Sequence, residues 1–386
     1  MSEKRKDSKG RILKPGESQR KDGRYQYRYT DLRGVRRLVY GNNLQELRSK
    51  EKEIELQLAK GINVFEGKMK LEELMDRAVK LKRNWRASTA KTMNQYLKII
   101  QASRLYRMQI SNIRMADCKQ YFIDLHDQGY SFATISSVHT LLRMAFTLAY
   151  EDDILVKNPC DFHLSAIVSD DAEKVAALTP EQEKSLFAFL REDTIGKRYL
   201  EMFTILIGTG MRISEFAALT VNDIDLASNV IHVNKQIVRL VGELTITEPK
   251  TDSGKRDIPM TREVRDAAKS LLARRQSVST NVMVGGYVGF LSVTRTGRPR
   301  THSEYADAVR KIMNRYNEVC DVEIPRCTPH VLRHTFCTKC IASGMDVKTV
   351  QYLMGHSDVS TTLNVYSDHV FENVVSNMEM LKIHCN

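Results

Sequence analysis

The chain has 386 residues, of which 42% are hydrophobic and 27% charged, and it carries a formal net charge of +12 with a pI of about 9.3. This length exceeds what one ordinary hydrophobic core organises, so two or three domains are expected. A positive balance of this size favours a polyanionic partner. The excess is concentrated at the start, where residues 1–40 hold 13 Lys and Arg against 5 Asp and Glu.

Three features of the sequence bear on where the protein works. Its seven cysteines are an odd number spread along the chain, and no signal-peptide pattern follows Met1. No apolar run approaches the length of a membrane span. We therefore expect a cytoplasmic protein in a reducing compartment, without a membrane partner.

The first predicted elements are two strands and a helix. Residues 24–30 alternate strictly between tyrosine on one face and arginine or glutamine on the other, which indicates a β-strand. A second strand is predicted over 35–40 and a helix from Leu44 to about Lys60. A small basic sheet backed by a helix fits a DNA groove, whereas an ordinary solvated face is the alternative. The candidate DNA-binding residues are Arg24, Tyr25, Tyr27, Arg28, Arg36 and Arg37.

A helical bundle is predicted between residues 71 and 152, because apolar residues recur there at helical spacing. The predicted helices are Leu71–Trp85, one capped by Ser88, Met115–Asp127 and Phe132–Tyr150. Asn158-Pro159 ends the bundle, and a linker runs to Ala177.

A further domain starts at Thr179-Pro180-Glu-Gln182, which combines a capping box with proline at the first helical position. The rest of the chain is predicted to be mostly helical. Its one clear β element is a hairpin with strands at 229–240 and 244–250, followed by a strand at 256–260. The expected fold class is therefore multidomain, mainly α with small β-sheets.

Two stretches of this domain carry candidate reactive groups. An apolar helix breaks at Gly208 and Gly210, and Arg212 opens the next helix, where backbone N–H groups already favour an anion. A plain helical ion pair between Arg212 and Glu215 is the simpler explanation. Lys250 ends a strand before a polar turn, from which an ammonium can reach a substrate, although most such lysines are solubilising charges.

A third stretch brings several polar groups close to the C-terminus. Thr328-Pro329 caps and starts a helix on which His330 and Arg333, three residues apart, point from one face. A short second helix ends at a glycine that precedes His356, and Tyr366 follows ten residues later. Two imidazoles, a guanidinium and a phenol together suit chemistry on a phosphate.

The local contexts Gly-Met-Arg-x-Ser-Glu, His-x-Leu-Arg-His-Thr and Met-Gly-His-Ser, in this order, resemble those of the tyrosine site-specific recombinases, the phage integrase family. The likeness covers residues 178–370. The preceding helices look like the family's core-DNA-binding domain, and the basic N-terminus looks like the three-stranded sheet plus helix of the arm-binding domain in phage and conjugative-transposon integrases. The resemblance implies an arm-binding domain at 1–62, a core-binding domain at 68–160 and a catalytic domain at 177–386.

The same resemblance assigns roles in breaking a phosphodiester. The implied catalytic residues are Arg212, Lys250, His330, Arg333, His356 and Tyr366. Each arginine offers paired donors to the phosphate oxygens and stabilises charge that develops in the transition state. The tyrosine attacks with His330 as base, Lys250 protonates the leaving 5′-oxygen, His356 hydrogen-bonds the phosphate, and a 3′-phosphotyrosine forms. No metal or cofactor is implied, because the arginines supply the positive charge.

The implied function is that of a recombinase that integrates and excises a mobile element, either a conjugative transposon or a prophage. The implied partners are double-stranded DNA at core and arm sites, further copies of the chain in a tetramer on DNA, and an accessory excision factor. Beyond Tyr366, apolar residues from Val370 to Leu381 follow the spacing of an amphipathic helix. This tail docks either on its own domain or, as the resemblance favours, on a neighbour.

The same residues admit other interpretations. The cysteines and histidines between 327 and 340 are dense enough for a zinc site, but a guanidinium in the same sector disfavours a cation. These residues are Cys327, His330, His334, Cys337 and Cys340. A DNA-binding regulator without turnover and a type IB topoisomerase are alternative functions. The complete polar set argues against the first, and the two extra DNA-contacting modules and the tail argue against the second.

Overall fold

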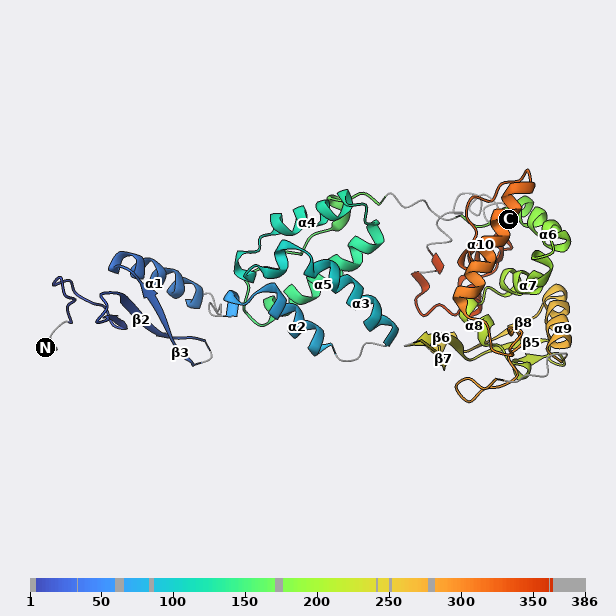
Figure 1. Cartoon of the computed structure of the whole chain (residues 1–386), viewed down its shortest axis with the longest axis horizontal. Coiled ribbons are helices and arrows are strands. Elements are labelled where there is room, and N and C mark those ends of the chain that lie inside the picture. Colours follow the sequence, from blue (N-terminus) through green and yellow to red (C-terminus); the bar gives the residue numbers. More distant parts are fainter. Residues whose placement is uncertain are drawn as a thin grey trace, which may run out of the picture. The chain divides into compact units, whose positions relative to one another are not determined.

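The structure, a computed structural model, describes residues 5–32, 34–59, 66–82, 87–170, 176–240, 242–249, 252–276, 282–360 and 362–363. It divides into two compact units, Met1–Glu173 and Lys174–Asn386 (Figure 1). The expected mainly α fold with small sheets is confirmed. The further division of the first unit into two domains, between residues 62 and 68, stays a prediction.

The first unit begins with an antiparallel sheet and a helix. Its elements are β1 (Glu17–Gln19), β2 (Tyr25–Thr30), β3 (Arg36–Gly41) and α1 (Leu44–Ala59), with the strand order β1-β2-β3. Alternate residues of β2 face α1, so that Tyr25 packs with Leu44 and Leu47 while Arg28 is exposed. The expected sheet and helix are therefore confirmed, and β1 supplies the third strand.

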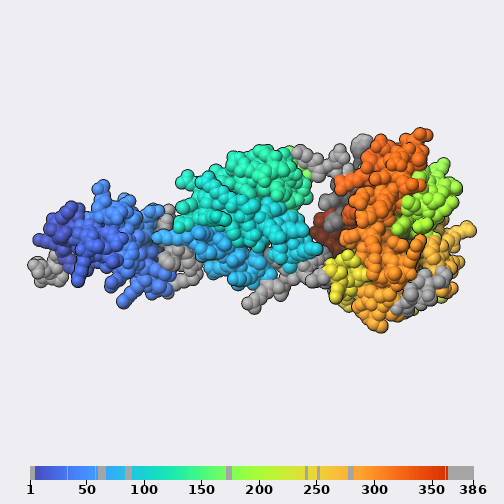
Figure 2. Space-filling view, viewed as in Figure 1, coloured from blue at the N-terminus to red at the C-terminus, as the bar shows by residue number. Residues whose placement is uncertain are grey.

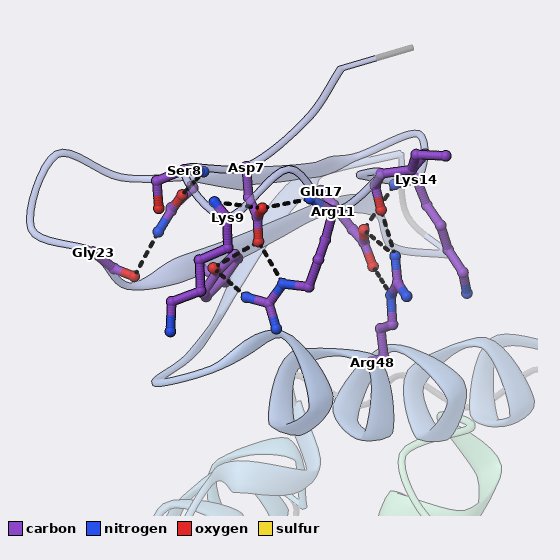
Figure 3. A network of polar contacts seen from close by, with 11 residues as sticks. Asp7, Ser8, Lys9, Arg11, Lys14, Glu17, Gly23 and Arg48 are labelled. Atoms are coloured by element: carbon purple, nitrogen blue, oxygen red, sulfur yellow. Dashed lines mark hydrogen bonds and ion pairs between the residues drawn. The ribbon is translucent and has the colours of Figure 1, made fainter.

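Buried carboxylates join the N-terminal segment to this sheet and to α1 (Figure 3). Asp7 accepts hydrogen bonds from the Arg11 guanidinium at 2.8 Å and from the Tyr25 hydroxyl at 2.9 Å. Glu17 of β1 is fully buried and accepts from Arg48 Nε of α1 at 2.9 Å (Figure 3). Because a buried charge needs a partner, these bonds fix how the basic segment lies on the helix.

Longer helices make up most of the rest of the first unit. They are α2 (Leu71–Leu81), α3 (Ala87–Gln101), α4 (Met115–Asp127) and α5 (Phe132–Glu151), with the 3-10 turns η1 (Glu66–Lys68), η2 (Arg104–Arg107), η3 (Ile110–Asn112) and η4 (Leu164–Ala166). The helix predicted to reach Trp85 ends at Leu81, and residues 83–86 lie outside the described part. The next helix begins one residue before the Ser88 predicted as its cap.

Helix α5 forms the centre of this bundle, with Val138, Leu142 and Phe146 fully buried. By length and composition it is also apolar enough to cross a membrane. The expectation that no apolar run approaches that length is therefore wrong. The apolar side of α5 packs against α2, α3 and α4 within the unit.

The second unit is mostly helical around a buried α7. Its helices are α6 (Pro180–Glu192), α7 (Leu200–Thr209), α8 (Ile213–Ala218), α9 (Arg262–Gln276), α10 (His302–Val319), α11 (Pro329–Ala342) and α12 (Val347–Met354), with the 3-10 turns η5 (Gly196–Arg198), η6 (Val221–Asp223) and η7 (Asp252–Gly254). The predicted capping box is present, since the Thr179 hydroxyl accepts from the Gln182 N–H. Phe203 and Leu206 of α7 are fully buried, and α9 and α11 pack against this helix.

The strand predicted over 229–240 is in fact two strands in different sheets. One sheet contains β4 (Ile224–Asp225), β5 (Val230–Val233) and β8 (Arg256–Pro259), whereas β6 (Gln236–Leu240) and β7 (Glu243–Thr247) form a separate hairpin. This hairpin, in yellow, reaches the surface of the second unit (Figure 2). Asn234 and Lys235 separate β5 from β6, and the buried ammonium of Lys235 donates to Asp223 at 2.6 Å. A charge must be paired to be buried there, and strand alternation alone does not reveal that partner.

Candidate active site

The junction between α7 and α8 positions the first predicted arginine. Gly210 ends α7 in the left-handed conformation, with φ 64°, and a Cβ there would lie 2.3 Å from Phe336 Cδ1. Arg212 is the N-cap of α8, as predicted, and its backbone N–H donates to Glu215 Oε2 at 2.8 Å. Its guanidinium donates to Glu215 Oε1 at 2.7 Å, so the simple ion pair considered above exists as well.

Arg333 lies buried against the ends of two helices. Thr328 caps α11 and Pro329 begins it, as predicted. Arg333 is 2% exposed, its Nη1 donates to the Gly210 carbonyl at 2.6 Å, and its Nη2 donates to the Met354 carbonyl. Carbonyls at helix ends lack partners within the helix, so the guanidinium satisfies both while they fix its plane.

A second left-handed glycine brings both arginines to the same helix end. α12 ends at Gly355, with φ 62°, and His356 follows directly. The Gly355 carbonyl accepts from Arg212 Nη2 at 3.2 Å, next to the Met354 carbonyl that accepts from Arg333. The last turn of α12 therefore orients both predicted arginines and places His356 beside them.

One buried carboxylate balances much of this positive charge. Glu215 is 2% exposed, and its Oε2 also accepts from Arg256 Nη2 at 2.9 Å. Burial alone would raise the pKa of Glu215, but the guanidiniums of Arg256 and Arg212 lower it below its ordinary value. The carboxylate therefore stays ionised between two arginines.

The imidazoles of the site are neutral at pH 7. Burial, and then the charge of Arg333, lowers the pKa of His356 to about 4. The same two causes lower the pKa of His330, whose residue is more exposed. Burial and the neighbouring Arg212 lower the pKa of Arg333 to about 9, so this guanidinium keeps its charge at neutral pH. The site thus combines fixed cations for an anion with a neutral imidazole that can accept a proton.

The sequence matches the phage integrase family over residues 176–373 and the DNA binding domain of Tn916 integrase over residues 1–58. The chain belongs to the phage integrase family. The transposases from transposon Tn1545 of Streptococcus agalactiae and from transposon Tn916 of Enterococcus faecalis are each 37% identical to it over 397 residues, covering 99% of this chain and 97% of theirs.

A solved structure agrees with this assignment. The Tn1549 transposon integrase in complex with a circular intermediate DNA is similar with a TM-score of 0.77 and 34% identity, over 81% of this chain and 100% of that one. The chain is thus a tyrosine recombinase, a site-specific enzyme that cuts and rejoins DNA strands. The expected family and enzyme class are confirmed.

The recombinase's predicted catalytic residues are only partly within the described structure. Arg212, His330, Arg333 and His356 come together around the ends of α7 and α12. Lys250 and Tyr366 lie outside the described residues. The catalytic roles of all six stay predictions.

Two residues of the site are absent from the sequence prediction, Arg256 and Thr362. Thr362 is fully buried, and its hydroxyl oxygen lies 2.9 Å from Nδ1 of His356. If the hydroxyl donates this bond, the imidazole keeps its proton on Nε2, where it can donate to a phosphate. Arg256 lies two residues before the buried Ile258 on β8, so both side chains are on the same face of the strand. This spacing was the sequence signal that the Arg256 side chain points into the core. No comparable pattern marks Thr362.

The structure gives no support to the zinc interpretation. No group of three or more His, Cys, Asp or Glu residues within the described ranges is placed to hold a metal ion. Burial raises the pKa of Cys327 to about 12, and that of Cys337 and Cys340 to about 11. Cys337 and Cys340 instead pack with Ile341 and Val350 in a small apolar core.

One candidate DNA-binding residue of the N-terminal sheet needs correction. Tyr25 is 3% exposed, with its hydroxyl bonded to Asp7, so it belongs to the core and not to a contact surface. Arg28 and Arg36 are exposed on the sheet face away from α1. Arg24 and Arg37 pair with nearby aspartates at 2.7 and 2.9 Å. The remaining candidates, Arg24, Tyr27, Arg28, Arg36 and Arg37, stay predictions.

Proposed function

We propose that this recombinase integrates and excises a mobile element, a conjugative transposon or a prophage, by cutting each DNA strand through a 3′-phosphotyrosine at Tyr366. The observation that carries the proposal is the pair of guanidiniums, Arg212 and Arg333, oriented by one helix end beside two neutral imidazoles. Its relatives at 37% identity are transposases, and the Tn1549 integrase has been solved with a circular intermediate DNA.

The two guanidiniums act on the reacting phosphate. A guanidinium has five N–H groups, and each of these arginines uses two of its nitrogens on protein acceptors. The remaining N–H groups of Arg212 and Arg333 can donate to the non-bridging oxygens, where negative charge grows in the transition state. Preorganised donors in such positions typically contribute about 3–4 kcal/mol each to the rate.

Tyr366 supplies the nucleophile for strand cleavage. Its oxygen forms a bond to phosphorus while the bond to the 5′-oxygen breaks, and His330 takes the phenolic proton. Lys250 gives a proton to the departing 5′-oxygen. The phosphotyrosine conserves the energy of the broken ester, so the 5′-hydroxyl of a second DNA end can attack it and release the tyrosine without ATP.

The N-terminal sheet would bind the arm sites through its exposed face. This face presents Arg28 and Arg36 together with Leu38 and Tyr40, which alternate with residues that point toward α1. Arg20 adds a further cation, with its guanidinium 5.3 Å from the ring centre of Tyr40. A sheet with this mix of cationic and apolar side chains suits the phosphates and base edges of a major groove.

The second unit carries a basic cleft that suits the core DNA. A hollow of about 840 Å³ beside α7, α9 and α10 is lined by Lys197, Arg198, Arg295, Arg300 and Lys311. Among the described residues, no carboxylate lies within ion-pair distance of these five side chains. Glu201, Glu304 and Asp307 also line the hollow, but they pair with Arg274, Arg298 and Arg310. The five cations would therefore bind backbone phosphates and make affinity fall steeply with salt.

Assembly into a tetramer on DNA would use the C-terminal tail. An apolar groove of about 1540 Å³ between α6, α7, α9 and α11 is lined by Phe187, Ile207, Val264, Phe336 and Met345, among others. We propose that it receives the apolar tail residues 370–381 of a neighbouring subunit. Deletion after Ser367 should spare DNA binding but weaken assembly, and unchanged oligomerisation on DNA would refute the exchange.

The proposed location of the protein is the cytoplasm. The remaining proposed partner is an accessory excision factor.

A nicked DNA substrate tests the function directly. The intact protein should become covalently attached to the DNA, and Tyr366→Phe should not. Strand exchange between two DNA sites identifies a recombinase, whereas relaxation of supercoiled DNA without exchange identifies a topoisomerase. If the intact protein forms no covalent adduct, a DNA-binding regulator without turnover is the remaining interpretation.

The role of Lys250 has its own test. A substrate with sulfur in place of the bridging 5′-oxygen has a leaving group that needs no proton. This substrate should restore cleavage to Lys250→Ala, and equal loss on both substrates would contradict the assignment as proton donor.

A further inference from the structure

Arg256, at the start of β8, is a buried charge with three distinct acceptors. Its side chain is fully buried. Nε donates to the Leu353 carbonyl at 2.7 Å, Nη1 to the Gly254 carbonyl at 3.1 Å, and Nη2 to Glu215 Oε2 at 2.9 Å. One planar guanidinium therefore joins α12, the turn before β8 and the start of α8.

Each of these acceptors lies close in the chain to a predicted catalytic residue. Glu215 holds the backbone and guanidinium of Arg212. Leu353 lies in the last turn of α12, three residues before His356. Gly254 follows Lys250 by four residues, in the turn that connects that lysine to β8.

The fit around Arg256 is tight on the side of the catalytic helix end. A Cβ at Gly355 would lie 2.9 Å from Arg256 Nη1. The same glycine presents its carbonyl to Arg212. A shift of the Arg256 guanidinium would therefore move the helix end on which the predicted arginines depend.

We propose that Arg256 is a positioning residue of the recombination reaction, which sets the places of Arg212, His356 and the turn after Lys250 without touching the DNA. The inference rests on the proposed function. Lysine cannot replace it, because one ammonium lacks the planar fork that reaches three acceptors in fixed directions. Displacing a catalytic group by about 1 Å costs on the order of a hundredfold in rate.

The test compares Arg256→Lys, Arg256→Met and the matched control Lys255→Ala in the full chain. Lys255 is the adjacent cation, but its ammonium pairs at the surface with Glu248 at 3.0 Å. Circular dichroism and urea unfolding report the fold, fluorescence anisotropy reports the Kd for a core duplex, and a nicked duplex at saturating protein reports the single-turnover cleavage rate.

We expect both Arg256 variants to fold and to bind DNA nearly as tightly as the unchanged protein, with cleavage slowed by about a hundredfold. Lys255→Ala should cleave at the normal rate. NMR titration of the His356 ring distinguishes the effect of the Arg256 charge from the effect of its hydrogen-bond geometry. The charge of Arg256 is one of those that lower the pKa of His356. That pKa should rise in Arg256→Met but stay low in Arg256→Lys, although both cleave slowly.

Normal cleavage by either folded variant overturns the proposal. Failure of both variants to fold also overturns it, because Arg256 would then be a purely structural ion pair. If the unchanged protein itself forms no covalent adduct with DNA, the proposed function is wrong. That outcome differs from failure of the present proposal, in which the unchanged protein and the Arg256 variants all cleave at the normal rate.

Discussion

Arginines serve two different purposes in the N-terminal sheet and in the candidate active site. Arg28 and Arg36 stand exposed on the sheet, where they can follow a DNA backbone. Arg333 and Arg256 are 2% and 4% exposed and bind carbonyls and a carboxylate of their own chain. Exposed cations gain affinity by releasing counterions, whereas folding sets the orientation of the buried ones, as the proposed roles of Arg333 at the transition state and of Arg256 in positioning require.

Removal of the carboxylate of Glu215, which pairs with Arg256 and Arg212, should have the largest effect on stability. Glu215→Gln leaves the buried guanidinium of Arg256 without its counter-charge, with Arg212 and Arg333 close by. We expect a loss of about 3–5 kcal/mol in the free energy of unfolding, the usual cost of breaking a buried ion pair. Urea unfolding measures it, with Arg28→Ala on the sheet as the control, which should stay within about 0.5 kcal/mol. Equal stability of Glu215→Gln and the unchanged protein would contradict the account.

A methyl group at the end of α7 should have the next largest effect. Gly210→Ala combines a left-handed backbone with a Cβ 2.3 Å from Phe336, so we expect a cost of about 2–4 kcal/mol. Gly129→Ala is the matched control, since Gly129 has φ 85° but no atom within 4 Å of the added Cβ. It should lose only about 1 kcal/mol. Thermal unfolding compares the two, and equal losses would show that close packing at Gly210 does not matter.

The half-buried imidazole of His356 predicts a dependence of stability on pH. Because the pKa of His356 falls from its ordinary 6.5 to about 4 on folding, the unfolded chain binds a proton between these values and the folded chain does not. This contribution is complete above pH 6.5 and is lost as the pH falls toward 4. Urea unfolding across this range should show a weaker pH dependence in His356→Gln. An identical slope in both proteins would show that folding does not lower the pKa of His356.

The sheet arginines should give the smallest effects. Arg28→Ala and Arg36→Ala should each reduce the salt dependence of arm-site binding by about one unit in the logarithmic slope. Cleavage of a core substrate should not change. Anisotropy titrations at several salt concentrations measure the slopes. Loss of core cleavage in either variant would contradict the separation between DNA-binding arginines of the sheet and arginines of the active site.

Local signals predict much of the fold and the order of the site residues. Thr179 and Thr328 mark helix starts, and Gly210 and Gly355 mark helix ends, because each has a backbone role that its residue type reveals. Periodicity also places β2 and β3 of the N-terminal sheet, but not β1. Each of these signals depends on only a few neighbouring residues, so it can be recognised from the sequence without knowledge of the fold.

Long-range pairing of polar groups is what the sequence conceals. The predicted strand over 229–240 is two strands, and between them Lys235 buries its ammonium against Asp223, 12 residues earlier in the chain. Tyr25 looks like a surface aromatic until its hydroxyl is seen on Asp7. Arg256 joins segments 41 and 97 residues away in the chain. Such partners depend on tertiary packing, so periodicity can mark Arg256 as inward-pointing but cannot reveal what it binds.

The most direct measurement is the single-turnover cleavage rate of Arg333→Lys on a nicked core duplex at saturating protein. An ammonium keeps the charge but cannot bind two carbonyls and the phosphate in one plane. We predict a rate lower by at least about a hundredfold with a nearly unchanged Kd for DNA, because the fixed guanidinium acts in the transition state. Weakened binding with a normal maximal rate would contradict this, and would place Arg333 with the arginines that merely hold DNA.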